Sequence, residues 1–146
     1  MKVRFVFLLC LVYLKGVAGA MFEGMGLGAR NISLGNGCVP GDEDLSNVYY
    51  NPAGSAQIRK LQFMSGYGLL HLGLSDGSRM NYGFSGVSLP WKGKNVVTLL
   101  WNGFNLVDTY RESMFLVNYS RKLHSRIALG LNLKLLSIGY VPDEYI

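Results

Sequence analysis

Residues 126–140 read RIALGLNLKLLSIGY, and this stretch decides the fold class of the chain. Every second position from Ile127 to Leu135 holds a branched aliphatic residue, whereas the positions between them are small or polar. Successive side chains of a strand point to opposite faces, so this alternation predicts a β-strand with one apolar face. The stretch also exceeds the roughly five or six residues of a soluble strand and the roughly 9–11 that a tilted strand needs to cross a membrane.

Four similar stretches come before it and predict four further strands. In residues 111–122, for example, Phe115, Val117 and Tyr119 alternate with Met114, Leu116, Asn118 and Ser120. The other stretches are residues 61–75, 79–91 and 95–107, and the turns are Asp76-Gly77-Ser78, Lys92-Gly93-Lys94, Asp108-Thr109-Tyr110 and Leu123-His124-Ser125. We therefore predict an all-β fold, a transmembrane antiparallel β-barrel of which about five strands are present, with residues 61–146 as its wall. The alternative is a soluble sandwich, whose inner faces also alternate.

Composition agrees with an exported membrane strand protein. Charged residues make up 16% of the chain, against about 25% in ordinary soluble domains. Beyond residue 20 the sequence contains no run of about 20 apolar residues, and it therefore predicts no transmembrane helix there. Few charges, many glycines and no spanning helix fit a transmembrane β-barrel. On composition alone, a secreted soluble β-protein stays open.

The first 20 residues are predicted to be a signal peptide. Lys2 and Arg4 precede an apolar run from Phe5 to Leu14, and Ala18-Gly19-Ala20 supplies the small residues of a cleavage site near Ala20. Ten apolar residues are too few for a spanning helix; a short anchor or buried strand is the alternative. Removal of the first 20 residues leaves 11 basic and nine acidic residues, so no argument for nucleic-acid binding remains.

Residues 21–60 differ from the strands and are predicted to form a short plug-like segment. They are rich in Gly, Asn and Asp and show no sustained alternation. Asp42-Glu43-Asp44 predicts the start of a short helix, because acidic residues are favoured at helix N-termini. Asn51-Pro52 predicts its end, since a residue before proline leaves the helical region. Cys38 is the only cysteine after the signal peptide and therefore has no partner for an internal disulfide.

Two groups of motifs resemble a known outer-membrane group. The first is Gly28-Ala29-Arg30, Leu34-Gly35-Asn36-Gly37, Asp42-Glu43-Asp44 and Tyr49-Tyr50-Asn51-Pro52-Ala53-Gly54; the second is Tyr110-Arg111-Glu112, Asn118-Tyr119-Ser120 and Leu129-Gly130-Leu131-Asn132-Leu133-Lys134. In this order they resemble the opening of PorV/PorQ-type proteins of the FadL-like superfamily, over most of residues 24–140. Cys38, Pro40 and Ser55 depart from the pattern, which usually has small apolar residues at the first two positions and leucine at the third.

The resemblance implies a barrel of roughly fourteen strands with an N-terminal plug in its lumen. It places Asn51, Pro52, Ala53 and Gly54 in the plug motif. Five strands cannot close a barrel, for which about eight is the usual minimum, and open edges would leave backbone groups unpaired in lipid. We therefore expect a truncated gene or fragment, with a barrel assembled from several copies as the alternative.

The sequence offers no catalytic constellation, metal-ligand spacing or cofactor motif, so we expect no enzyme activity and no bound cofactor. If Leu123–Ser125 forms the last hairpin turn, Glu112 lies opposite Leu136 and diagonal to Lys134, which predicts a Glu112–Lys134 ion pair in the lumen. Two unrelated charges are the alternative. Asn118 and Asn132 are predicted to line the lumen with Met114, Leu116 and Leu136.

Two functions follow from the resemblance. The FadL branch implies an outer-membrane barrel that binds or passes hydrophobic small molecules, without cofactor or energy input. The PorV branch implies a component of the type IX secretion system that acts in protein export. The expected location is the bacterial outer membrane, with outer-membrane lipid as one partner and either a hydrophobic small molecule or secretion-machinery proteins as the other.

Overall fold

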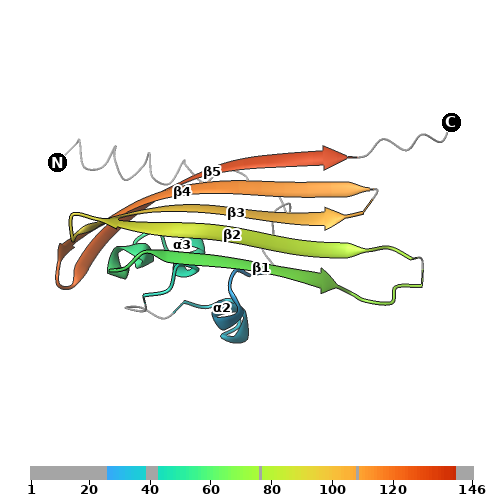
Figure 1. The fold of residues 1–146 in the computed structure, drawn as a ribbon, viewed down its shortest axis with the longest axis horizontal. Coiled ribbons are helices and arrows are strands. Elements are labelled where there is room, and N and C mark those ends of the chain that lie inside the picture. Colours follow the sequence, from blue (N-terminus) through green and yellow to red (C-terminus); the bar gives the residue numbers. More distant parts are fainter. Residues whose placement is uncertain (1–25, 39–42, 76, 108, 141–146) are drawn as a thin grey trace, which may run out of the picture.

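The computed structural model describes residues 26–38, 43–75, 77–107 and 109–140. The predicted signal peptide, Pro40, Asp42, Asp76, Asp108 and residues 141–146 of the predicted wall lie outside them. The described chain forms one antiparallel sheet in the order β1-β2-β3-β4-β5 (Figure 1). The strands are β1 (Gln62–Leu70), β2 (Met80–Trp91), β3 (Asn95–Leu106), β4 (Tyr110–His124) and β5 (Ile127–Tyr140). The predicted all-β class and the predicted number of strands in this chain are confirmed.

Each strand pairs with the next one along the chain, so the sheet is a simple meander. β1 is shorter than predicted, because His71 has a φ of 49° and Gly73 a φ of 83°, both outside the extended region. Tyr110, predicted in a turn, begins β4 instead. None of the helices in the described ranges has the length and hydropathy needed to cross a membrane.

The β4–β5 hairpin corrects the predicted register. The turn is Ser125-Arg126, not Leu123–Ser125, so His124 pairs with Ile127. If this pairing continued along both strands, the aliphatic residues of β5 would lie on the other face of the sheet, because a register shift of one residue exchanges the two faces. An irregularity between Lys122 and His124 absorbs the extra residue, after which Lys122 pairs with Ala128 and the predicted faces are kept.

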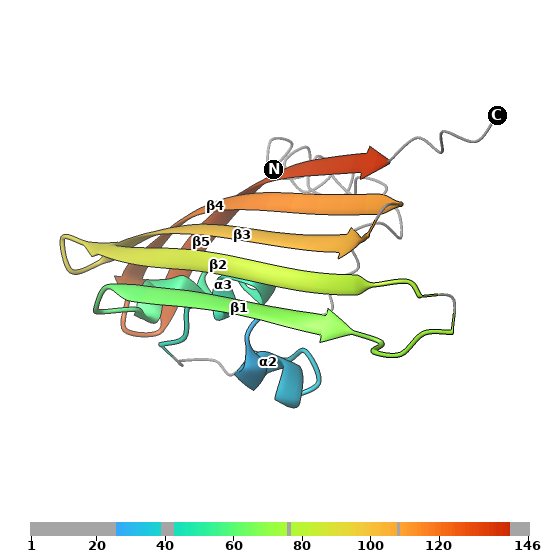
Figure 2. The same cartoon turned by 45° about the vertical axis from the view of Figure 1, so that its right-hand side comes forward.

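In the N-terminal segment, residues 26–58, the described residues form three short helices: α2 (Ala29–Ser33), α3 (Asn47–Tyr50) and the 3-10 helix η1 (Gly54–Gln57). Helices α2 and α3 lie on the same side of the sheet in both views of the ribbon (Figures 1 and 2). The predicted helix end is confirmed, since Asn51 before Pro52 is extended with φ −137° and ψ 107°. The helix start predicted at Asp42-Glu43-Asp44 is wrong, because α3 begins at Asn47, with Ser46 as its N-cap and no acidic residue in its first turn. Asp44 precedes the helix, and its Oδ1 accepts hydrogen bonds from the Ser46 amide at 2.8 Å and from the Ser46 hydroxyl at 2.6 Å.

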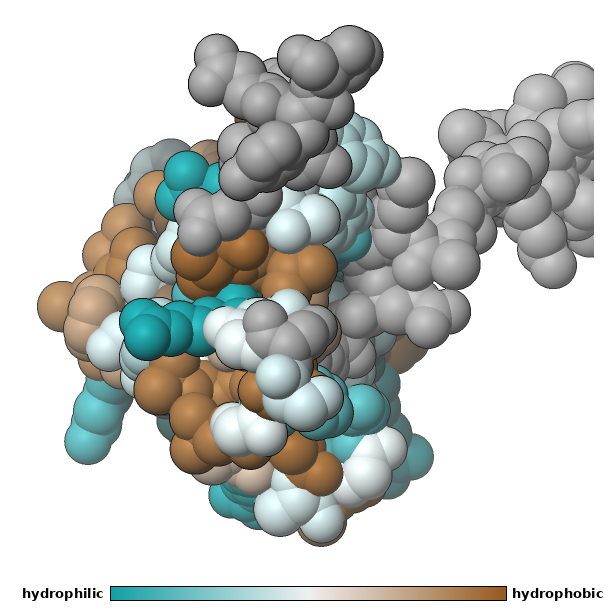
Figure 3. Space-filling model, turned by 90° about the vertical axis from the view of Figure 1, so that its right-hand side faces the viewer, coloured by the Kyte–Doolittle hydropathy of each residue, from teal (hydrophilic) through white to brown (hydrophobic). Residues whose placement is uncertain are grey.

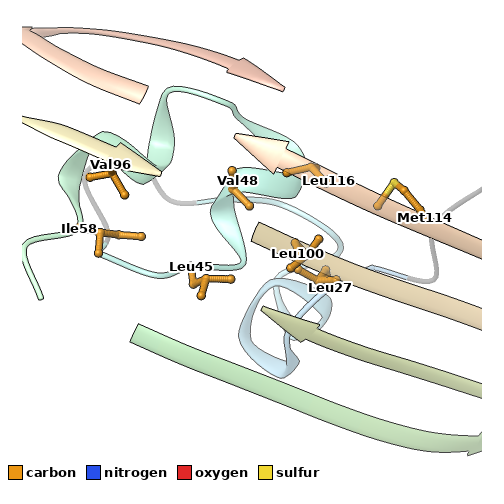
Figure 4. Packing of buried hydrophobic residues seen from close by; sticks show 8 residues of the cluster. All are labelled: Leu27, Leu45, Val48, Ile58, Val96, Leu100, Met114 and Leu116. Atoms are coloured by element: carbon orange, nitrogen blue, oxygen red, sulfur yellow. The ribbon is translucent and has the colours of Figure 1, made fainter. Parts of the chain in front are cut away.

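A small hydrophobic core joins the N-terminal segment to the sheet (Figure 4). Four of its side chains come from the segment and four from β3 and β4, and all are at most 4% exposed. They are Leu27, Leu45, Val48 and Ile58 on one side and Val96, Leu100, Met114 and Leu116 on the other. Because burying each such side chain stabilises the fold by about 1.5–3 kcal/mol, this core holds the segment on one face of the sheet.

The two faces of the sheet differ sharply. The inner face, defined as the face that carries the N-terminal segment, bears the even-numbered residues of the strands and the buried core. The outer face bears the odd-numbered residues. On β5 it exposes the predicted aliphatic row, in which Leu131 is 72% and Leu133 60% exposed. The predicted alternation of β4 and β5 is confirmed.

Candidate functional site

A polar row crosses the inner face of the sheet beneath the N-terminal segment. Ser88, Thr98, Asn118 and Asn132 are successive register partners on β2, β3, β4 and β5. The hydroxyls of Ser88 and Thr98 lie 2.7 Å apart and are fully buried. The structure thus brings the predicted lumen residues Asn118 and Asn132 together on the inner face. It places them under the segment and not in open space.

Asn118 is the centre of a hydrogen-bond network that ties the segment to the sheet. Its Nδ2 donates to Asn132 Oδ1 at 2.7 Å and lies 3.0 Å from the carbonyl oxygen of Pro52, while its Oδ1 accepts from Ser55 Oγ at 2.6 Å. Asn132 Nδ2 in turn donates to the Val48 carbonyl at 2.9 Å. We call these groups, together with Ser120 Oγ at 2.8 Å from Ser55 Oγ, the Asn118 network.

The predicted plug motif lies directly on this network. Asn51 Oδ1 accepts from the Ala53 amide at 3.1 Å and the Asn51 carbonyl accepts from the Gly54 amide at 2.9 Å, which fixes a tight turn. That turn presents the Pro52 carbonyl to Asn118. A leucine at position 55 would oppose polar Asn118 and Ser120. The buried Ser55 hydroxyl instead forms hydrogen bonds with both.

Glycine at position 130 allows the closest approach of the segment to β5. A Cβ there would overlap the carbonyl group of Pro52 and lie 2.5 Å from the Ala53 nitrogen. We expect Gly130→Ala to destabilise the protein by about 1–3 kcal/mol, because the plug motif must move to make room. Urea unfolding in detergent measures the change. Gly139→Ala on the same strand is the matched control, since a Cβ there meets no atom within 4 Å; equal losses for both variants would contradict the assigned contact.

The predicted Glu112–Lys134 pair rests on the wrong register. Glu112 lies opposite Ile138 and Lys134 opposite Leu116, so the two are four residues apart along the ladder, about 13 Å at the usual strand rise. They share the inner face, as predicted. Glu112 accepts a hydrogen bond from the Tyr110 hydroxyl, and Lys134 Nζ lies 5.0 Å from the ring centre of Tyr49.

Tyr49 of α3 therefore interacts electrostatically with both Lys134 and Glu112. Burial raises the pKa of its phenol, and the nearby Tyr50 and Glu112 raise the pKa further. The ring stays neutral at ordinary pH and can take the cation of Lys134 on its face. This contact is a further attachment of the segment to β5, and no sequence pattern predicts it.

Beyond the segment, the inner face continues as an apolar surface. We call Phe104, Tyr110, Leu136, Ile138 and Tyr140 the inner apolar patch. Ring centres lie 6.5 Å apart for Phe104 and Tyr110 and 5.2 Å apart for Tyr110 and Tyr140. Leu136 is 54% exposed. Figure 3 views the molecule from the right-hand end of Figure 1 and shows apolar side chains at the surface of that end, with hydrophilic ones between them. Of the three apolar residues predicted to line the lumen, Leu136 remains open, whereas Met114 and Leu116 are buried under the segment.

Within the described ranges, no three His, Cys, Asp or Glu side chains form a group that could hold a metal ion. No model of a known protein family, no curated protein and no solved structure matches the chain. What the chain does is therefore inferred from the residues that its two faces present.

Proposed function

We propose that this sheet is part of the wall of an outer-membrane β-barrel of the FadL-like kind and that residues 26–58 plug its lumen. The barrel binds hydrophobic small molecules and lets them pass. One observation supports this most strongly. The face of the sheet turned away from the segment is apolar and exposed, although the core elements of the described residues all pack on the other face.

The outer face bears apolar side chains in complete rows across the strands. The central row is Phe63, Val87, Leu99, Val117 and Leu133, one residue from each strand. A neighbouring row is Leu89, Val97, Tyr119 and Leu131. Since cross-strand partners stand side by side, these rows form a continuous apolar surface. A single exposed leucine would be unremarkable, but a contiguous patch of this kind marks contact with a partner or with lipid.

The apolar surface has limits that fit a membrane. On β4, Arg121 and Arg111 point outward ten positions apart, with Phe115, Val117 and Tyr119 between them. Ten residues span about 34 Å along a strand, or about 25 Å after the usual barrel tilt, which is the height of the apolar band of such barrels. Trp91 also lies on the outer face, in the register row of Arg121, where an aromatic residue flanks such bands, whereas Trp101 lies inside the band opposite Phe115.

The soluble sandwich predicts a second layer over the outer face. Among the described residues, every element outside the sheet that contributes to the core packs on the inner face. The outer leucines of β5 stay more than half exposed as a result. Contact with lipid satisfies such a surface, and this supports the barrel over the sandwich.

The inner apolar patch supports a hydrophobic ligand. It adjoins the plug, and the two charged side chains beside it on the inner face are both engaged, Glu112 by the Tyr110 hydroxyl and Lys134 by the ring of Tyr49. A molecule entering along this surface would contact Leu136 and Ile138 before it reached the segment. Its passage would require the Asn118 network to open, since this network fixes Pro52 and Ser55 to the sheet. The resemblance adds the class of molecule, such as a long-chain fatty acid.

A binding experiment on the full chain in detergent tests this function. We expect a fluorescent long-chain fatty acid to bind the wild type, and the double variant Leu136→Asn with Ile138→Asn to bind about tenfold more weakly, because two polar amides replace apolar contacts. Ser137→Asn, on the outer face between them, should leave the affinity within about twofold. Absence of binding by the wild type, or equal binding by all variants, would exclude the fatty-acid ligand. If the protein were nevertheless retained in the membrane fraction, that result would favour a protein-export role.

A further inference from the structure

The outer face becomes polar toward the end of the sheet at which β1 and β3 finish, on the right in Figure 1. Past the row of Trp101 and Phe115, the last two register rows consist mainly of small and polar residues. They are Tyr67, Gly83, Gly103, Ser113 and Ser137, and then Leu69, Asn81, Asn105, Arg111 and Gly139. We call these two rows the polar edge. Its one charged side chain is Arg111, and the outer face of the described strands carries no acidic side chain, since Glu112 lies on the inner face.

Two aromatic rings lie over the glycine residues of the polar edge. Trp101 comes from the neighbouring row, and its Nε1 donates a hydrogen bond to the Ser113 hydroxyl at 2.8 Å. A Cβ on Gly103 would lie 2.8 Å from Cζ2 of the Trp101 ring, so a side chain at this position would displace the indole. A Cβ on Gly83 would lie 3.6 Å from Cδ2 of Tyr67. The two glycines therefore let both rings lie close to the backbone of the sheet.

A hollow of about 200 Å³ lies on the polar edge. Its outer-face lining combines two rings, two carboxamides and one cation, from Tyr67, Trp101, Asn81, Asn105 and Arg111. Glu112 also borders the hollow, but its carboxylate binds Tyr110 on the other face. The hollow is smaller than the roughly 300–1,000 Å³ of sites for whole drug-sized ligands, so it fits a single polar group. A guanidinium and two carboxamides supply the N–H donors that phosphate oxygens accept from.

The level of the hollow follows from the strand geometry. Arg111 lies six residues from Val117 of the central apolar row, on the same strand and the same face. Six residues span about 20 Å along a strand, or about 15 Å after the usual barrel tilt. The hydrocarbon core of a bilayer extends about 15 Å from its middle. With the central row at the middle of the bilayer, Arg111 therefore lies at the level of the lipid headgroups.

We infer that the hollow binds the phosphate of a membrane phospholipid whose acyl chains lie on the apolar rows of the outer face. The hollow and these rows share one face, and Trp101 connects them, since it stands beside Phe115 in its own row and reaches over the polar edge to Ser113. Arg111 holds the phosphate through a pair of N–H donors, and Asn105, its neighbour across the strands, adds an amide. The inference rests on the proposed membrane location and not on the passage of ligands.

The fluorescence of Trp101 tests the inference. The chain has two tryptophans, so Trp91→Phe leaves Trp101 as the only one. In the full chain with this change, in a neutral detergent, we expect dioctanoyl phosphatidylglycerol to shift the emission of Trp101. It should bind at least about tenfold more tightly than dioctanoylglycerol, which lacks the phosphate, and added salt should weaken this preference because it screens the charge of Arg111. Arg111→Gln in the same background should lose most of the preference.

Arg121→Gln is the matched control, because Arg121 lies on the same strand and the same face at the other end of the apolar rows. It removes the same charge and should keep the preference within about twofold of the Trp91→Phe parent. Equal binding of the two lipids, or an equal loss in both arginine variants, would overturn the inference. Inorganic phosphate that bound as tightly as phosphatidylglycerol would also overturn it, since the acyl chains would then add nothing. Fatty-acid binding at the inner apolar patch is measured separately, so each proposal can fail without the other.

Discussion

We expect the Leu133→Arg variant to partition less into the membrane fraction and to be less stable in lipid than the wild type. Leu133 is 60% exposed in the central apolar row of the outer face, with Val117 beside it on β4. If this row lies near the middle of the bilayer, an arginine there costs about 2–4 kcal/mol of folding free energy in lipid. Partition between the membrane and soluble fractions, followed by urea unfolding in vesicles, measures the effect.

Ser137→Arg is the control for this variant. Ser137 lies on the same strand and the same face, four residues closer to the polar edge of the outer face, where its neighbour across the strand is Ser113. Near an interface, arginine costs only about 0–1 kcal/mol. Equal losses at both positions would remove the membrane argument, and a wild-type protein that stayed soluble without detergent would favour the sandwich.

Asn118→Leu is expected to release the N-terminal segment from the sheet. The two side chains have similar volume, but leucine removes the hydrogen bonds of Asn118 with the Pro52 carbonyl, the Ser55 hydroxyl and Asn132 Oδ1, and the Ser55 hydroxyl keeps only its contacts with Ser120 and Pro52. Buried polar groups that lose a hydrogen bond cost about 1–3 kcal/mol each, so we expect a loss of about 2–4 kcal/mol after partial relaxation. Hydrogen exchange should then quicken at the amides of Gly54, Ala56 and Ile58.

Asn105→Leu provides the comparison. Asn105 lies on the outer face of β3, opposite Arg111, and has no role in holding the segment. Exchange in residues 47–58 should be unchanged in this variant. If Asn118→Leu left exchange in that segment as slow as in the wild type, the Asn118 network would not be what holds the segment on the sheet.

The pattern of side chains was sufficient to predict the strands and their faces. Alternation in residues 111–122 and 126–140 depends only on the two-residue period of a strand, and the structure confirms which residues share a face. Likewise, Asn51-Pro52 was sufficient to predict the end of α3, because proline constrains the residue before it locally. Such features need no knowledge of distant parts of the chain.

The register of β4 and β5, the burial of Met114 and Leu116, and the Asn118 network were decided only by the tertiary structure. The register depends on a turn and an irregularity whose choice reflects which faces the whole sheet must bury, and the sequence of the turn alone favoured another answer. The network joins residues more than 60 positions apart, and Tyr49 meets Lys134 across a similar gap in the sequence. Local pattern determines which side of a strand a residue occupies. What lies against that side depends on packing between segments that are distant in the sequence.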